Sequence, residues 1–315
     1  MKENYLWDKS GEPEPEIQRL EQLLSPLGDR TPVLSFPKRN RMPYFLAIAA
    51  SLLVLASGVW VAWQKSRPAW EVARVGGTPS VRRLAKGESI TTDFHSHARL
   101  NLDDVGEVEV EPNTKLSVLA MRPDEQRLEL DHGTIHALIW APPGRFVVDT
   151  PSAQTVDLGC QYTLHVDASG VGVVEVTVGW VAFENEGRES FIPAGAACTT
   201  RPGQGPGIPY YQDASPELVT ALNRFDTNAG GSAIAVILEQ ARPRDAVTLW
   251  HLLRRVQPDQ RPGVYDRLSQ FITVPAGVTR DGVLAADPQM IDALWNTLDL
   301  GNTSWWRMWK SRGPK

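Results

Sequence analysis

The sequence predicts a mixed fold with one transmembrane helix, an all-β domain and a C-terminal α-helical region. An uncharged apolar run over residues 44–63 predicts the membrane span. Apolar and polar residues alternate from about residue 70 to 200 and predict strands, whereas helical periodicity returns after residue 215. We expect five segments in chain order: a short cytoplasmic segment (1–43), the transmembrane helix (44–63), the all-β domain (64–200), a Pro/Gly linker (201–214) and a helical region with a Trp-rich basic tail (215–315).

The apolar run reads YFLAIAASLLVLASGVWVAW and has no charge in 20 positions. At 1.5 Å per residue a helix of this length spans about 30 Å, the hydrocarbon thickness of a bilayer. Tyr44 and Trp63 mark its two ends, where aromatic rings prefer the headgroup level. Because 43 residues precede the run, more than the leader of a cleaved signal peptide, we expect an uncleaved anchor.

Composition and charge narrow the class of partner. The 315 residues are 42% hydrophobic and 22% charged, with a formal net charge of −5. Residues 1–43 are neutral and residues 301–315 carry four positive charges, so the acidic balance belongs to residues 64–300. A basic domain is typical of nucleic-acid binders, and this charge therefore predicts no nucleic-acid partner.

The two cysteines, Cys160 and Cys198, are too few for a disulfide scaffold or a four-thiolate zinc site. They flank 37 residues of predicted strands and are our candidates for one structural disulfide. The alternative is two unpaired buried thiols. Since both follow the predicted span and would pair in an oxidising compartment, we place the N-terminus in the cytoplasm and the body outside.

A short amphipathic helix is expected before the predicted span. Ile17, Leu20, Leu24 and Leu27 recur at spacings of three or four and share one helical face. An isolated helix of this length is marginal in water, so this face is our candidate partner-binding surface. The alternative is a solvated tether with incidental leucines.

Short strands with one buried face make up the β-domain, either as a β-solenoid or as a β-sandwich. The predicted strands are Ala98–Leu102, Glu107–Val110, Thr114–Val118, Arg127–Leu130, Ile135–Trp140, Arg145–Asp149, Tyr162–Val166, Val171–Val178 and Trp180–Asn185.

The C-terminal region reads as several amphipathic helices. Ser215-Pro216-Glu217 is a capped helix start, and further helices are expected over 233–241, 243–256, 263–271 and 288–298. The tail places Trp305, Trp306 and Trp309 among basic residues. Its role stays open between a docking strip, a membrane-surface contact and a last piece of core.

No catalytic motif is present, so we predict neither an enzyme nor a cofactor or metal site. Histidines at 95, 97, 132 and 136 are the only grouping that suggests a metal, and a surface role is commoner. Asp103 and Asp104 could serve an envelope hydrolase, but Glu107, Glu109 and Glu111 alternate with valines as the solvated face of a strand does.

An ordered set of strand and turn residues extends over 87–195: Ile90-Thr91-Thr92, Ala98 to Asp103 with Gly106, Pro112 to Leu116, Leu128-Glu129-Leu130 with Gly133, Phe146 to Pro151, Val156, Gly159, and Val174-Glu175-Val176 with Gly179-Trp180-Val181. In this order and spacing the segment resembles the FecR domain family. Its members are single-pass inner-membrane regulators with a periplasmic β-rich domain.

The resemblance implies a bacterial inner-membrane protein with a cytoplasmic N-terminus and a periplasmic body. It implies that the chain controls an extracytoplasmic-function sigma factor in response to an envelope signal. In that case the face formed by Ile17, Leu20, Leu24 and Leu27 would bind the factor by helix-in-groove recognition. The alternative is an envelope scaffold that holds a protein or glycan partner and regulates no sigma factor.

Overall fold

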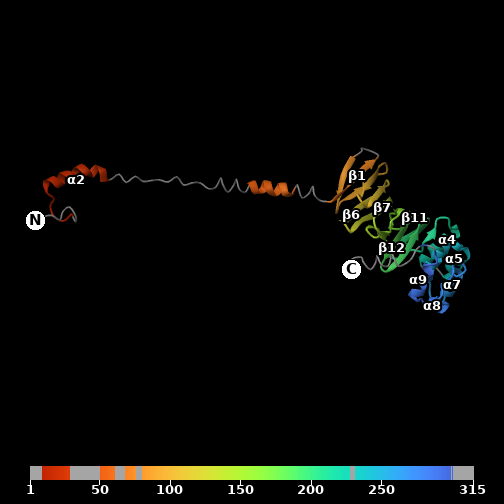
Figure 1. Cartoon of the computed structure of the whole chain (residues 1–315). Coiled ribbons are helices and arrows are strands. Elements are labelled where there is room, and N and C mark those ends of the chain that lie inside the picture. The colour runs from red at the N-terminus through yellow and green to blue at the C-terminus, as the bar shows by residue number, and fades with distance from the viewer. Residues whose placement is uncertain are drawn as a thin grey trace. The chain divides into compact units, whose positions relative to one another are not determined.

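The structure is a computed structural model that describes residues 9–28, 50–60, 68–75, 80–227, 231–298 and 300. The chain divides into two compact units, Met1–Ser66 and Arg67–Lys315. In the first unit, helix α2 covers Pro15–Gly28 and a second helical stretch covers residues 50–60. The second unit holds all the described strands and the helices that follow them, as Figure 1 shows.

The prediction of a transmembrane helix over residues 44–63 is wrong. No helix in the described part of the chain is both long enough and apolar enough to cross a bilayer. The helical stretch within the apolar run has 11 residues, from 50 to 60. Residues 44–49 and 61–63 lie outside the described residues.

Two β-sheets that share strand β7 form the β-domain. The first sheet contains, in spatial order, β2 (Ser80–Ala85), β1 (Ala69–Val75), β4 (His97–Asn101), β5 (Gly106–Val110), β7 (Glu125–Ile139), β10 (Gln161–Val166), β11 (Gly172–Val178) and β14 (Ala196–Arg201). The second contains β3 (Ser89–Thr91), β6 (Lys115–Arg122), β7, β8 (Phe146–Asp149), β9 (Gln154–Asp157), β12 (Trp180–Asn185) and β13 (Arg188–Pro193).

Strand β7 joins the sheets because it bends at Gly133. Residues before the bend pair with β6 and β8, and residues after it pair with β5 and β10. Gly133 has φ 102°, and a Cβ at this position would collide with Thr114. The sequence predicted two strands here, Arg127–Leu130 and Ile135–Trp140. They are one strand, since a glycine in this conformation turns the chain without ending its pairing.

Both sheets contribute to one hydrophobic core. Leu100, Val108 and Ile135 of the first sheet and Leu116 and Phe146 of the second belong to the same buried cluster. Among the described strands, every pairing is antiparallel except that of β7 with β8. Antiparallel sheets around one core correspond to the β-sandwich alternative, because a solenoid stacks parallel rungs.

The segment after β14 is ordered by pairing and burial. β15 (Gly205–Pro206) and β16 (Tyr210–Tyr211) both pair with β14, and Ile208 between them is 1% exposed. The linker expected over 201–214 is therefore packed against the β-domain.

Helices begin where the sequence predicts the capped start. The Ser215 hydroxyl accepts a hydrogen bond from the Leu218 amide at 3.2 Å. Every residue of α6 is buried, and the Trp250 indole donates to the Ile291 carbonyl at 2.7 Å. The elements are α4 (Pro216–Asp226), α5 (Gly231–Gln240), η1 (Pro243–Asp245), α6 (Ala246–Leu253), α7 (Arg261–Leu268), α8 (Arg280–Leu284) and α9 (Pro288–Trp295).

Candidate functional site

Helix α2 carries all four residues predicted to bind a partner. Pro15 opens the helix, and Glu16 lies in its first turn, where the helix dipole favours a negative charge, so local sequence accounts for its start. None of the side chains of α2 is buried in the structure. Leu20 is 60% exposed, Leu24 53% and Leu27 67%, whereas Ile17 is partly buried.

Leu23 belongs to the same face, although the spacing of three or four residues did not include it among the predicted binding residues. It is 72% exposed, the largest fraction on the helix among the leucines. At 100° per residue Leu23 lies about 40° from Leu27, so a helical-wheel projection would have included it. We call Ile17, Leu20, Leu23, Leu24 and Leu27 the leucine face. A face of this width is typical of a helix that fits into an apolar groove.

Acidic residues border the leucine face. Residues 12–28 contain four glutamates and a single arginine, Arg19. Glu16 lies one turn before Leu20, and Glu21 lies one turn after Ile17. The helix therefore offers apolar anchors with negative charge around them, which matches an apolar groove with basic residues on its rim.

The prediction of a disulfide between Cys160 and Cys198 is wrong, because both cysteines are free and buried. β11 lies between the strand that follows Cys160 and the strand that holds Cys198. Cys198 pairs with Val174, which in turn pairs with Leu164, so Cys198 is level with a residue four positions beyond Cys160. Two strand spacings alone are about 9.6 Å, more than the Cα separation a disulfide spans. The argument that placed the N-terminus in the cytoplasm and the body outside depended on this disulfide, so it no longer holds.

Cys160 instead takes part in a buried polar group with Asp157. Its thiol donates a hydrogen bond to the Asp157 carboxyl, which also accepts from the Gly159 amide at 2.7 Å. Asp157 is 1% exposed, and this burial raises the pKa of its carboxyl to about 7. Burial and the adjacent carboxylate raise the pKa of the Cys160 thiol as well, so this thiol is protonated and chemically inert.

A buried ion pair connects the helices with the β-domain. Arg255, just after α6, lies 3.6 Å from the Asp226 carboxylate of α4. The same guanidinium donates to the Pro206 carbonyl at 3.0 Å and to the Ser190 hydroxyl of β13 at 2.5 Å. Burial raises the pKa of Asp226 and lowers that of Arg255. These contacts hold α4, α6 and the β-domain together.

Neutral His251 is part of the same junction. Its Nε2 accepts the Phe191 amide of β13 at 3.0 Å, so Nδ1 carries the proton and donates to the Val247 carbonyl at 2.9 Å. Burial lowers the pKa of this imidazole well below its usual value. Trp295 of α9 packs beside it, with ring centroids 5.8 Å from Phe191 and 6.0 Å from Trp180.

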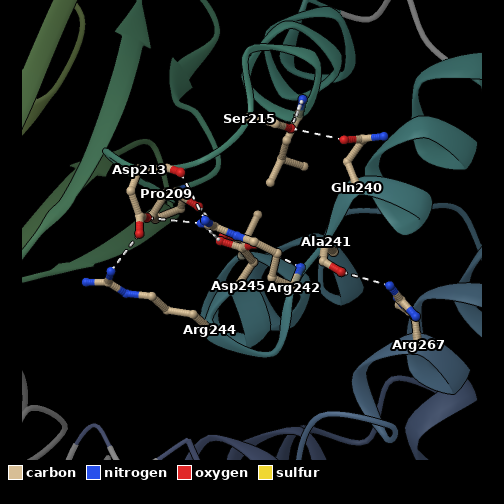
Figure 2. Close-up of polar contacts among 11 residues, drawn as sticks. Pro209, Asp213, Ser215, Gln240, Ala241, Arg242, Arg244, Asp245 and Arg267 are labelled. Carbon is tan, nitrogen blue, oxygen red and sulfur yellow. Dashed lines mark hydrogen bonds and ion pairs between the residues drawn. The ribbon is translucent and has the colours of Figure 1, made fainter.

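A second ionic network fixes the segment before α4 to the start of α6 (Figure 2). The Arg242 guanidinium lies between two carboxylates, donating to Asp245 at 2.9 Å and to Asp213 at 3.0 Å. Arg244 donates to the other oxygen of Asp213 at 2.9 Å. Hydrogen bonds from Arg242 lower the pKa of Asp213, so the network stays charged at neutral pH. Its role is structural, since it orders a connection.

An open acidic cleft of about 530 Å³ lies on the second sheet. A row of residues in register crosses five strands along it: Glu129, Asp149, Gln154, Glu184 and Glu189. Arg127 is paired with Asp149 at 2.7 Å.

The histidines and strand carboxylates that suggested chemistry are surface groups. His136 contacts Glu111 at 3.0 Å and Thr163 at 2.9 Å. β5 alternates buried valines with outward glutamates, as predicted for a solvated strand face. In the described part of the chain, no three His, Cys, Asp or Glu side chains are placed to hold a metal ion.

Comparison with known protein families finds one match, which lies within the β-domain. Residues 88–182 match the family model described as FecR protein. No curated protein matches the sequence.

Two crystal structures of a "putative anti-sigma factor" from Parabacteroides distasonis ATCC 8503, at 1.65 and 2.50 Å resolution, are similar to this chain. Both share 18% identity over 44% of this chain, with TM-scores of 0.36 and 0.35. The chain spans 65% of the first and 64% of the second, less than two thirds of either.

Proposed function

Because residues 88–182 carry a FecR domain, we propose that this chain regulates a sigma factor of the extracytoplasmic-function class and binds it through helix α2. The domain supports a regulatory role, and the leucine face supports the place of contact. In this proposal Arg67–Lys315, the unit that contains the FecR domain, receives the signal and α2 delivers the response.

The single observation that carries the place of contact is the exposure of the leucine face. Leu20, Leu23 and Leu24 are all more than half exposed on a described helix that buries none of its residues. Keeping such a face in water is costly, since each leucine side chain is worth roughly 2 kcal/mol on burial. A groove that covers two or three of them supplies much of the free energy of a specific complex.

The test is capture of sigma factor by the full chain. Leu20→Asp together with Leu24→Asp places two charges on the leucine face, and we expect the affinity to fall by more than about 100-fold. Gln18→Asp with Gln22→Asp adds the same charges on the opposite side of α2 and should retain binding. Circular dichroism of both variants checks that the helix content is equal.

Equal capture by the two variants would refute the role of α2. Loss of the regulatory phenotype on deletion of residues 9–28 supports a regulator. A phenotype that survives this deletion instead supports the envelope scaffold.

A further inference from the structure

Three large apolar side chains lie exposed together on the FecR domain, outside any contact used above. Leu138 is 46% exposed, Trp140 54% and Val178 56%. Leu138 is near the end of β7 and Trp140 follows two positions later, so both project to the same side of the strand. We call these three residues the apolar patch.

Strand register brings the members of the apolar patch together. Gln161 of β10 pairs with Leu138 on one side and with Val178 on the other. The pairing of β10 with β11 shifts between Gln161 and Tyr162, where Val178 and Val176 are successive partners. The extra residue, Thr177, makes a β-bulge that turns Val178 outward. The bulge thus places a valine on the solvent face.

Negative charge borders the apolar patch. Glu107 of β5 pairs directly with Leu138, and Glu175 of β11 faces outward three residues before Val178. A ligand for this surface needs large apolar groups for the patch and positive charge for its border. The chain contains such a segment: residues 301–315 hold three tryptophans and four basic residues with no acidic residue.

The end of the described chain lies close to the patch. Trp295 of α9 packs against Trp180 with tilted rings whose centroids are 6.0 Å apart, and Trp180 is two residues beyond Val178. Leu298 and Leu300 pack against the hydrophobic core that also contains Trp295. Fifteen further residues, extended, reach up to about 50 Å. The segment is thus tethered near the patch at high effective concentration.

We propose that the segment 301–315 covers the apolar patch of its own β-domain, with its tryptophans on Leu138, Trp140 and Val178 and its basic residues toward Glu107. The segment then acts as a built-in cover for a surface of the FecR domain. This cover is independent of helix α2 and of the sigma-factor proposal.

Photo-crosslinking in the full chain tests the cover. A benzophenone amino acid replaces exposed Gln161, at the centre of the patch, and in a matched chain it replaces exposed Glu129 in the acidic cleft. We expect position 161 to crosslink to the peptide 301–315 within the monomer, identified by mass spectrometry, and position 129 to give several-fold less of this product.

Two variants separate apolar docking from charge attraction. Replacing Trp305, Trp306 and Trp309 by alanine should abolish the crosslink from position 161, whereas Arg307→Gln with Lys310→Gln should only weaken it. Three results would overturn the proposal: a stronger crosslink from position 129, no crosslink to 301–315 from position 161, or crosslinks found mainly between isotopically light and heavy copies in a mixture, which would assign the segment to a second copy.

Discussion

At the scale of single residues, Asp157 is a buried carboxyl group whose pKa is strongly raised. Its side chain is buried in the sandwich and interacts with the Cys160 thiol and the Gly159 amide. Burial raises its pKa from 3.8 to about 7. The folded chain therefore binds this proton more tightly than the unfolded chain. The stabilising contribution is complete below about pH 4 and is lost as the pH rises through 7.

Asp157→Asn removes this titration. We expect the variant to gain stability relative to the wild type as the pH rises from 4 to 8, by up to about 4 kcal/mol. Urea denaturation at a series of pH values measures the difference. Asp167→Asn is the control of opposite sign, because hydrogen bonds from Ser169 lower the pKa of Asp167 and its contribution is lost as the pH falls. A pH-independent difference for Asp157→Asn would contradict this account.

Residue-level prediction from sequence succeeded where local spacing was enough. The leucine positions of α2 follow from a 3.6-residue period, and only Leu23 needed the full helical wheel. Local spacing could not predict whether Cys160 and Cys198 form a disulfide. Their separation depends on β11 lying between them, which is a property of strand order.

At the scale of elements, β7 is the critical strand because it belongs to both sheets. Gly133→Ala forces a side chain into a left-handed conformation and against Thr114. We expect a loss of about 3 kcal/mol or more in the free energy of unfolding. Gly187→Ala is the matched control, with φ 81° but open space around it, and should cost about 1 kcal/mol. Equal losses in chemical denaturation would show that the contact with Thr114 is unimportant.

Elements were predicted best where their period and their end signals agreed. Ser215 and Pro216 marked the start of α4, and the alternation of β5 marked its buried face. The apolar run at 44–63 predicted a membrane span, but no helix in the described residues is long and apolar enough to cross a membrane.

At the scale of the whole molecule, the β-domain and the helices of Arg67–Lys315 belong to one compact unit. Arg255 and Asp226 join them at a buried site. We expect tryptophan fluorescence and far-UV circular dichroism to report one coincident unfolding transition of this unit. Arg255→Met should lower its stability by about 3 kcal/mol, since Asp226 keeps a buried charge without this partner.

The double variant Arg255→Met with Asp226→Asn separates the charge effect from lost packing. It should be clearly more stable than Arg255→Met alone, because neither charge remains at the site. A double variant as unstable as the single one would show that the guanidinium contacts to Pro206 and Ser190 matter more than the ion pair.

The sequence by itself determined the β-rich domain and its FecR resemblance, the helices after Ser215 and the leucine face of α2. These features depend on alternation, periodicity and capping, which act over a few neighbouring residues. Only the tertiary structure decided that β7 is one bent strand, that the cysteines stay apart, and that Leu138, Trp140 and Val178 meet on one surface. Strand order and register bring together residues distant in sequence, and no local pattern encodes that pairing.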